Sequence, residues 1–192
     1  MSCAWCGADF AARADARFCS GRCRVAAHRA DVPAELRERD RWLRHDAKRP
    51  IQVNGRAASS TDPATWTTYA DADASEVGDG LGFALGDGVA CIDLDHCLDD
   101  GVLADWAAPI VAACRGTYME VSPSGHGLHI WGHAEVGKGR KLGGVEVYDR
   151  GRYMTVTKRR FGRSPLRLLD IQAQVDLLLG NHDALGAPVI AA

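Results

Sequence analysis

Two carboxylates beside an apolar segment are the first residues whose types and spacing could do chemistry. Asp93 and Asp95 alternate with Ile92 and Leu94 at the end of the apolar run 89–92. Successive side chains of a strand point to opposite faces, so a strand here would put both aspartates on one face. Two such carboxylates can bridge divalent cations about 4 Å apart, with a third carboxylate completing the site. A carboxylate pair alone also caps strands or binds stray cations, so its partners decide the interpretation.

Two glutamates are candidates for the third carboxylate. Glu146 and Glu120 each lie between two apolar residues of a strand-like segment, so each would point away from its neighbours. We prefer Glu146, because the run Asp-Arg-Gly-Arg-Tyr at 149–153 follows it.

A glycine-rich segment supplies groups that could bind phosphate. Residues 122–129 read Ser-Pro-Ser-Gly-His-Gly-Leu-His. Gly125 and Gly127 would let the backbone approach an anion closely, while the Ser124 hydroxyl and His129 could donate to phosphate oxygens. Alone this segment would indicate only a turn. Beside the acidic pair it predicts a triphosphate cradle next to a metal site.

Four cysteines near the start predict a structural zinc site. Cys3 and Cys6 are followed after twelve residues by Cys19 and Cys23, which gives two close pairs of thiolates. Zinc prefers four such ligands in a tetrahedron, and its binding energy can replace a core that about thirty residues cannot build. His28 is a less favoured substitute ligand. The alternative is a set of thiols without metal, and the arginines of this segment leave nucleic-acid contact open.

Composition is that of a globular protein with segregated charge. The 192 residues are 46% hydrophobic and 25% charged, with seven cysteines and a net charge of −2. Residues 62–105 hold eleven acids and no Lys or Arg, whereas residues 138–167 hold ten bases and two acids. Such a distribution permits binding of cations and polyanions together, although charge runs are often only solvated faces. We find neither a membrane span nor a secretory signal and expect a cytoplasmic protein, in a bacterial or phage-infected cell.

Periodicity and turn signals predict an α+β fold with helices on one face of a mainly antiparallel sheet. The expected helices cover 34–45, 64–74, 103–114 with a break at Pro109, and 166–179. The expected strands cover 48–53, 82–85, 89–95, 118–122, 127–132, 144–148 and 153–157, with 82–85 and 89–95 as a pair and the last two as a hairpin. We expect a zinc-binding module at 1–30, a core at 31–180 and a flexible tail at 181–192.

Three segments together resemble successive motifs of the archaeo-eukaryotic primase superfamily, and in particular the primase-polymerases of phages and plasmids. They are Gly-Phe-Ala-Leu at 82–85 with Ile-Asp-Leu-Asp-His-Cys at 92–97, then 122–129, then Glu-Val-Tyr-Asp-Arg-Gly-Arg-Tyr at 146–153. The segments 48–50 and 58–66 also look like that branch. The resemblance covers about residues 40–175, and the cysteine module lies outside it.

The resemblance implies a fold, a mechanism and residue roles. The fold would be an RRM-like sheet packed with a smaller α/β unit. Asp93, Asp95, Glu146 and His129 would be the catalytic residues. The three acids would hold Mg²⁺ or Mn²⁺, while Ser124 and His129 would contact the phosphates of the incoming nucleotide. The reaction would be two-metal attack of a 3′-hydroxyl on an α-phosphate.

The nucleotide site expected on this basis extends beyond those residues. Arg150 and Arg152 are candidates for phosphate or template contacts, and Tyr153 could sense the sugar 2′-hydroxyl or simply be a strand aromatic of the core. The bases at 138, 140, 141 and 158–160 would follow a nucleic-acid backbone. The complete predicted set is Ser122, Ser124, Gly125, Gly127, His129, Arg150, Arg152 and Tyr153.

The expected partners are a DNA template and primer and dNTP or NTP substrates. Larger members of the resembled superfamily carry a helical domain or helicase after the core, so priming from scratch would need either a separate helicase or helical priming partner, or the zinc module to hold the initiating nucleotide or template. The main rival is a nucleic-acid-binding replication accessory without catalysis, and a repair polymerase of the same superfamily is another. A rolling-circle endonuclease on a related sheet is a weaker rival, because it needs two histidines separated by a single apolar residue together with a nucleophilic tyrosine, whereas His133 is four residues after His129.

Overall fold

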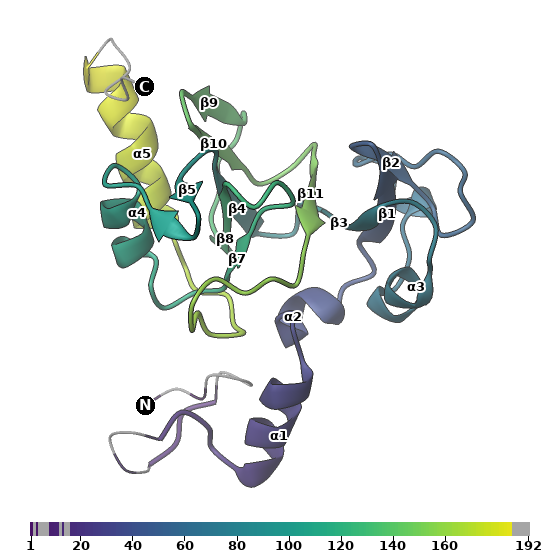
Figure 1. Ribbon diagram of the computed structural model, residues 1–192, viewed down its shortest axis with the longest axis horizontal. Coiled ribbons are helices and arrows are strands. Elements are labelled where there is room, and N and C mark those ends of the chain that lie inside the picture. Colours follow the sequence, from purple (N-terminus) through teal and green to yellow (C-terminus); the bar gives the residue numbers. More distant parts are fainter. Residues whose placement is uncertain (2, 4–7, 12, 14–15, 186–192) are drawn as a thin grey trace.

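The structure is a computed structural model that describes residues 1, 3, 8–11, 13 and 16–185. Cys6, the side chain of His28 and residues 186–192 of the expected tail therefore lie outside the described part. The described residues form two larger antiparallel sheets that face each other, with a separate two-stranded hairpin and flanking helices (Figure 1). This is the expected α+β class with mainly antiparallel pairing.

The larger sheet has five strands in the order β7-β8-β4-β10-β9, and every neighbouring pair is antiparallel. The expected strands at 118–122, 127–132, 89–95 and 144–148 are all present in it. The strand bounds are β4 (Val89–Leu94), β7 (Met119–Val121), β8 (Leu128–His133), β9 (Arg140–Leu142) and β10 (Val145–Tyr148).

The smaller sheet has four strands in the order β11-β3-β1-β2, again all antiparallel. Here β2 ends before Gly55, whose φ of 83° suits the turn expected at Asn54-Gly55. The strand bounds are β1 (Trp42–Asp46), β2 (Arg49–Ile51), β3 (Gly80–Ala84) and β11 (Tyr153–Val156).

Two helices, α4 (Ala108–Ala113) and α5 (Gln172–Leu185), cover the outer face of the five-stranded sheet (Figure 1). Their side chains pack on alternate residues of the strands, such as Ile92 and Leu94 of β4, in one apolar cluster. Because β4 buries Ile92 and Leu94 on this face, Asp93 is directed to the inner one.

The inner face of the five-stranded sheet shares a second core with the four-stranded sheet. Phe83 of β3 meets Trp131 of β8 edge to face, with ring centroids 6.0 Å apart. Trp42, Leu36 of α2 (Ala34–Arg37) and Ala72 of α3 (Tyr69–Ala74) complete this cluster from the side of the smaller sheet. Trp42, Trp131 and Phe83 are fully buried, so the shared core fixes the two sheets against each other.

The two expected strand pairs around glycine turns are wrong as pairs, although all four strands exist. β3 and β4 lie in different sheets, and so do β10 and β11. The connections 85–88 and 149–152 carry the chain across the core, and β10 pairs with β4 while β11 pairs with β3. A turn signal specifies that the chain reverses locally, but burial on two facing layers decides which strand it joins.

The expected helix at 34–45 is correct only at its start. α2 ends at Arg37, and β1 begins at Trp42. Trp42 donates its Nε1–H to the Leu36 carbonyl and stacks edge to face on Phe83. Burial of this indole in the shared core outweighs the helical pattern of the charged residues around it.

The expected helix at 64–74 is divided, because Thr67 pairs with Trp42. Pro63 begins a short 3-10 helix, η1 (Pro63–Thr65), behind the N-cap Asp62, as its position suggested. α3 then starts afresh after Thr68, whose hydroxyl accepts from the Asp71 N–H.

The helix expected at 103–114 is also shorter than the pattern suggested. Its first residue, Leu103, instead ends a two-stranded hairpin of β5 (Leu98–Asp99) and β6 (Val102–Leu103) around Asp100-Gly101, both with positive φ, and residues 104–107 are not helical. Asp-Gly is a strong signal for such a turn, and the sequence analysis missed it. Pro109 lies in the first turn of α4, where its missing N–H costs nothing.

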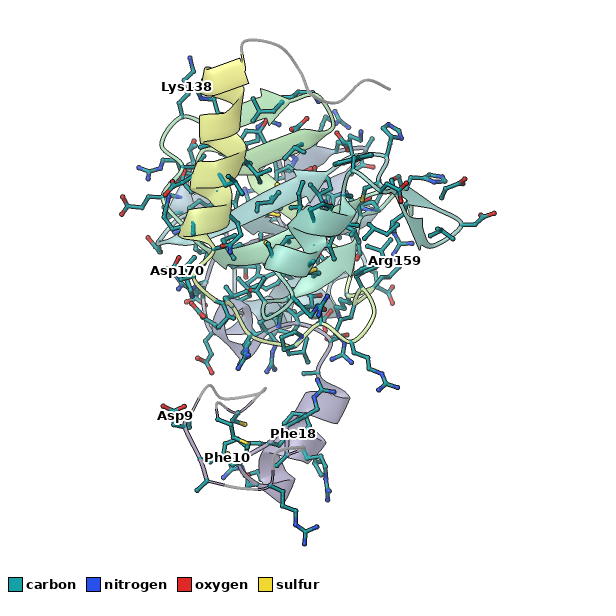
Figure 2. All side chains as sticks on the ribbon, turned by 90° about the vertical axis from the view of Figure 1, so that its left-hand side faces the viewer. Asp9, Phe10, Phe18, Lys138, Arg159 and Asp170 are labelled. Atoms are coloured by element: carbon teal, nitrogen blue, oxygen red, sulfur yellow. The ribbon has the colours of Figure 1, made fainter. Side chains whose placement is uncertain are left out.

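The closing helix begins at Gln172, six residues later than expected. Leu166 and Leu168 are buried in the shared core, in the non-helical segment before it. The cysteine-rich segment with α1 (Gly21–Arg29) lies apart from the sheets and joins them through α2 (Figures 1 and 2). No helix of the described residues is long and apolar enough to cross a membrane.

Candidate functional site

A row of five ionisable side chains crosses the inner face of the five-stranded sheet. Glu120 of β7 lies opposite His129 of β8, and His129 lies opposite Asp93 of β4. Asp93 lies opposite Glu146 of β10, and Glu146 lies opposite Lys141 of β9. Directly opposite residues of neighbouring strands have Cβ atoms about 5 Å apart and point to the same face. We call these five residues the ionic row.

The ionic row lies where the shared core ends. One step along the same face stand Tyr118, Trp131, Cys91 and Tyr148, all of which belong to the shared core. The exposed fraction of the row's side chains rises from 0% at Glu120 and 4% at His129 to 63% at Lys141. The row therefore runs from the protein interior to solvent at the β9 edge.

Asp93 has the burial and the charged neighbours that suit a cation ligand. Burial raises its pKa to about 6, against the opposing effect of His129 and with support from Asp95 and Glu146. Its Oδ1 is buried and has no hydrogen-bond partner among the described residues. His129 Nε2 lies 3.8 Å from that oxygen, beyond hydrogen-bonding distance. A buried carboxylate oxygen with other acidic side chains nearby is a suitable ligand for a divalent cation.

The Lys141 ammonium offsets the negative charge of the other two acids, Asp95 and Glu146. Its ammonium contacts Glu146 and lies 4.0 Å from Asp95 Oδ2. Burial alone would raise the pKa of Glu146, but the hydrogen bonds from Lys141 and from the Tyr148 hydroxyl at 2.9 Å lower it overall. Glu146 is thus held as a carboxylate that faces Asp93.

The three acids do not yet form a closed ligand cluster. Among the described residues, only Cys3, Cys19 and Cys23 bring three ligating atoms within 4.8 Å of one another. Asp95 comes just after β4, and its N–H donates to the Gly144 carbonyl at 2.8 Å, which fixes its backbone beside β10. The predicted acids therefore share one edge of the site, with the Lys141 ammonium between Asp95 and Glu146.

The glycine loop at 122–127 is a preformed turn beside the end of β4. A Cβ on Gly127 would come within 2.7 Å of the Leu94 carbonyl oxygen, so only glycine fits there. The N–H groups of Gly125, His126 and Gly127 all donate within the loop, to the carbonyl or hydroxyl of Ser122 and to the Ser124 hydroxyl. Ser122 is buried and Ser124 is exposed, so the Ser124 hydroxyl is the loop donor that a ligand can reach.

Glu120 belongs to the site together with Glu146. The sequence pattern offers the two glutamates as alternatives, whereas the structure puts both in the ionic row. Glu120 Oε1 lies 3.4 Å from His129 Nδ1. Burial alone would lower the pKa of His129, but the hydrogen bond and charge of Glu120, with Asp93, raise it overall. The signal in the sequence was the position of Glu120, two residues before the loop.

The residues after β10 are divided between the two sheets. Arg150 makes two hydrogen bonds to the buried Asp149, at 3.0 and 2.6 Å. The Arg152 guanidinium stacks on Tyr148 at 4.4 Å, whose hydroxyl donates to Glu146. Arg152 therefore lies beside the ionic row, while Arg150 is occupied by its neighbour.

Tyr153 belongs to the smaller sheet and is half-buried. Its hydroxyl donates to the Lys48 carbonyl at 2.7 Å, and its ring lies 6.3 Å from that of His45, nearly parallel to it. Gly82 leaves room for this ring, since a Cβ there would lie 2.6 Å from the Tyr153 Cδ2 atom.

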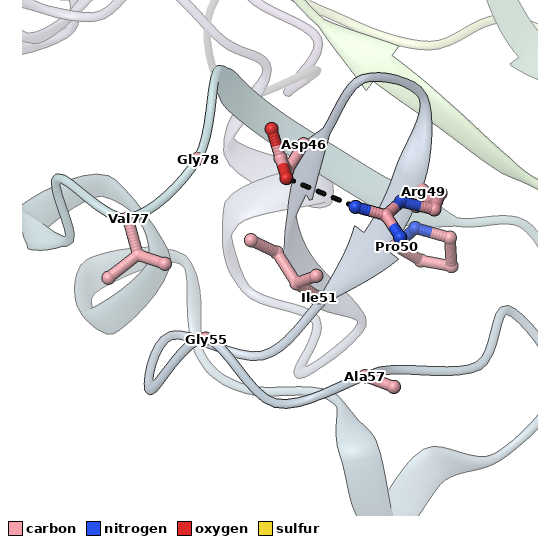
Figure 3. Close-up of a pocket in the computed structure, with 8 residues that line it drawn as sticks. All are labelled: Asp46, Arg49, Pro50, Ile51, Gly55, Ala57, Val77 and Gly78. Carbon is pink, nitrogen blue, oxygen red and sulfur yellow. Dashed lines mark hydrogen bonds and ion pairs between the residues drawn. The ribbon is translucent and has the colours of Figure 1, made fainter.

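A groove of about 630 Å³ lies beside Tyr153 and the loop, lined by residues of β1, β3 and β11 together with Pro123, Lys158 and Arg159. Thr155, one of its lining residues, also contributes a backbone carbonyl near His129. The groove thus adjoins the buried end of the ionic row. A second hollow of about 490 Å³, under the β1–β2 hairpin, contains none of the predicted site residues (Figure 3).

The basic residues expected to follow nucleic acid form two separate groups. Lys138 and Arg159 lie well apart (Figure 2). Lys158 pairs with Asp73 and Asp31, and Arg159 donates to the Ser122 carbonyl. Arg159 therefore braces the glycine loop.

Three of the four predicted zinc ligands come together in the amino-terminal segment. The Sγ atoms of Cys3, Cys19 and Cys23 lie within 4.8 Å of one another, and the Cys19 N–H donates to Cys3 Sγ at 3.4 Å. Cys6 lies outside the described residues. Backbone N–H groups directed at clustered sulfurs fit thiolate ligands of zinc. Cys91, Cys97 and Cys114 are buried, as expected of small apolar side chains.

Comparison with known proteins points in the same direction as the motifs. No protein-family model matches the chain. The chain is similar to the DNA primase-polymerase of Nitratiruptor phage NrS-1, with 36% identity over 160 residues. The similarity covers 75% of this chain and 22% of the phage protein, so the chain spans about a fifth of the length of that relative. This likeness supports the resemblance to primase-polymerases.

Proposed function

We propose that this chain is the catalytic core of a primase-polymerase that transfers nucleotides from triphosphates to a 3′-hydroxyl on a DNA template. The observation that carries the proposal is the register of His129, Asp93 and Glu146 across three neighbouring strands. It puts carboxylates for a cation and a donor for phosphate side by side on one face of the sheet. The similarity to a phage protein called DNA primase-polymerase supports the same reaction.

Asp93, Asp95 and Glu146 would hold Mg²⁺ or Mn²⁺, which would supply positive charge for the phosphate and for the attacking hydroxyl. The raised pKa of Asp93 and its unpartnered Oδ1 supply the local reason for a cation there. Glu146 faces Asp93 as a carboxylate, and Lys141 would move from the acids towards the phosphates of a bound nucleotide. The ligands project from adjacent strands, which keeps their spacing rigid.

His129 and Ser124 would bind the triphosphate. His129 is 3% exposed and presents Nε2 on the Asp93 side, while Ser124 offers an exposed hydroxyl at the end of the preformed loop. Ser122, Gly125 and Gly127 shape this loop through its internal hydrogen bonds. Donors held before the reaction favour the charge that develops on phosphate oxygens.

The groove beside Tyr153 would receive the nucleoside. Tyr153 would contact the sugar, Arg152 would reach the phosphate side, and Lys158 and Arg159 would face the nucleic acid. Arg150 would contact the template by leaving its pair with Asp149. The same proposal includes an RRM-like core, a zinc-binding module at 1–30 and a helicase or helical priming partner. It also includes a role in phage or mobile-element replication in the cytoplasm of the host.

The test is incorporation of labelled dNTPs and NTPs on primed and unprimed single-stranded DNA with Mg²⁺ or Mn²⁺. We expect product with the unchanged protein and none with Asp93→Ala, whereas Asp99→Asn, a change at an exposed acid of the same acidic segment, should retain it. DNA binding without incorporation would indicate the replication accessory instead. Full synthesis after chelation of all divalent cations would exclude the mechanism.

A further inference from the structure

Lys158 lines the groove of about 630 Å³ and has a backbone conformation that suits glycine. Its φ is 61°, in the left-handed region that is unfavourable for a residue with a Cβ. The Lys158 N–H donates to the buried Glu120 carboxylate at 3.0 Å, which holds this part of the segment after β11 in place. Strained residues of this kind are concentrated at functional sites, so the direction of the Lys158 side chain suggests a function.

The Lys158 ammonium lies between two carboxylates from different parts of the chain. It contacts Asp73 of α3 and lies 3.6 Å from Oδ2 of Asp31, in the connection between α1 and α2. Burial alone would lower the pKa of Lys158, but the hydrogen bonds with Asp73 and Tyr69 raise it overall. The exposed fractions of the two acidic side chains are 37% for Asp73 and 48% for Asp31. Lys158 is therefore a cation paired with acids that solvent can reach.

A purely structural role does not account for this arrangement. Exposed ion pairs contribute little to stability, whereas the left-handed backbone of Lys158 reduces it. Asp73 and Asp31 each make their one ion pair within the described part of the chain with Lys158. The two acids thus serve to neutralise this lysine at the edge of the groove.

The groove itself has an excess of positive charge. Its lining includes four bases, Arg44, Lys48, Lys158 and Arg159, and two acids, Asp73 and Asp79. Asp79 accepts from the Ala47 N–H at 2.7 Å and so supports the turn after β1. Asp73 is then the acid that offsets the charge of the groove at Lys158. Such a surface suits the phosphates of a polyanion.

We propose that Lys158 binds a phosphate of a nucleic-acid strand in this groove, and that Asp73 and Asp31 take the place of that phosphate when the strand leaves. The inference deepens the proposed function and rests on it for the identity of the polyanion. A template strand must advance after each incorporation. A phosphate leaves an ammonium more readily when a neighbouring carboxylate replaces its charge, so the two acids keep the strand exchangeable.

The test is binding of the chain to a fluorescein-labelled single-stranded oligothymidylate, followed by fluorescence anisotropy at a series of KCl concentrations. Nucleotides and divalent cations are left out, so the result does not depend on incorporation. We expect Asp73→Asn and Asp31→Asn each to raise the affinity by about two- to fivefold, the range of an exposed ion pair. Lys158→Gln should weaken binding and lower the slope of log affinity against log salt by about 0.7, the value for one phosphate contact on a single strand.

Asp71→Asn is the matched control, because it makes the same change of charge on the same helix. The Asp71 carboxylate accepts from the hydroxyls of Thr67 and Thr68 and makes no ion pair within the described part of the chain. Its substitution should leave the affinity nearly unchanged. Equal gains for Asp71→Asn and Asp73→Asn would show an effect of net charge alone and overturn the inference.

The double variant Asp73→Asn/Lys158→Gln decides whether the acid acts through the lysine. The gain from Asp73→Asn should disappear when Lys158 is absent, and a gain that persists would contradict the inference. Melting temperatures show whether each variant is folded. If Lys158→Gln fails to fold, Lys158→Arg takes its place with an unchanged salt slope expected, and the comparison of Asp73→Asn with Asp71→Asn still decides.

Displacement distinguishes a nucleic-acid strand from free phosphate. Unlabelled oligothymidylate should displace the labelled strand, whereas inorganic triphosphate at the same phosphate concentration should not. Equal displacement by triphosphate would assign Lys158 to the phosphates of a nucleotide and refute its role in strand binding. A chain that shows the expected affinities but incorporates no nucleotide would refute the proposed function and leave the role of Lys158 intact.

Discussion

Glu146 lies directly opposite Asp93 in the antiparallel pair of β10 and β4. Two acids that are far apart in the sequence thereby share one face of the sheet, with Lys141 opposite Glu146 on the other side. The register of β10 against β4 sets the spacing of Asp93 and Glu146, two of the three proposed cation ligands. Changes at each position of this arrangement have separable consequences.

Glu146→Gln keeps the side-chain shape and removes the charge that faces Asp93. We expect nucleotide incorporation to fall by at least about 100-fold, since even the outer partners of metal ligands are worth about 10- to 100-fold. Tyr148→Phe is the control, because it removes only the hydroxyl that donates to Glu146 at 2.9 Å. Steady-state incorporation rates compare the two, and equal losses would mean that Glu146 acts through the core.

Asp93→Asn should stabilise the metal-free protein at neutral pH. The folded-state pKa of about 6 exceeds the ordinary 3.8, so the folded state binds this proton more tightly than the unfolded chain. Stability from Asp93 is therefore lost as pH rises from about 4 to about 6, by up to about 3 kcal/mol, and stays lost above that. Urea unfolding at pH 5 and pH 7.5 should show a gain for Asp93→Asn that is larger at pH 7.5. A gain in unfolding stability that does not depend on pH would contradict the raised pKa of Asp93.

Lys141→Met should tighten Mn²⁺ binding in the absence of nucleotide. The Lys141 ammonium contacts Glu146 and lies near Asp95, so it competes with a cation for both acids. Exposed ion pairs contribute little free energy, so we expect the Mn²⁺ affinity to rise by about two- to fivefold. Titration calorimetry measures the affinity, with the exposed Lys138→Met as control. Weaker Mn²⁺ binding by Lys141→Met would show that Lys141 supports the cation site.

Tyr153→Ala should increase the use of ribonucleotides relative to deoxyribonucleotides, whereas Tyr153→Phe should retain the preference. The Tyr153 ring packs over Gly82 and lies nearly parallel to the His45 ring, and its hydroxyl donates to the Lys48 carbonyl. The ring would therefore exclude the 2′-hydroxyl by its bulk. Competition between dATP and ATP in single incorporations measures the ratio, and an unchanged ratio in Tyr153→Ala would make Tyr153 a packing residue.

Cys19→Ser should reduce bound zinc from one ion per chain to well below one. Cys19 and Cys23 lie with their sulfurs 3.5 Å apart, so loss of one thiolate opens the site. Cys114→Ala, in the core under α4, should keep the full zinc content. Elemental analysis measures zinc, and near-ultraviolet circular dichroism should show intact packing around Trp42 and Trp131 in both variants.

The elements with local signals were predictable from the sequence. The alternation of polar and apolar residues predicted that Asp93 and Asp95 lie on the other face of the strand from Ile92 and Leu94. The glycines predicted the turn before His129. Membership of the two sheets was not predictable, because the turns at 85–88 and 149–152 look the same whether the next strand pairs back or crosses the core. For the same reason the sequence did not predict that Trp42 lies in a strand, since its partner Phe83 in the core is distant in sequence.

The site was predictable in its residue types but only partly in its geometry. Glu120 and Glu146 share the same local pattern, and only strand order reveals that one faces His129 and the other Asp93. Lys141 was assigned to nucleic acid from its charge, whereas its place beside Asp95 and Glu146 follows from the pairing of β9 with β10.

The two crossings at 85–88 and 149–152 also constrain how this chain acquires its structure. Each sheet draws its strands from both sides of a crossing, so neither can be completed before most of the chain has been synthesised. Pairings between distant segments carry the cost of closing long loops before they gain any contacts. The chain should therefore fold slowly and unfold as one cooperative unit, and the ionic row should exist only when both sheets do.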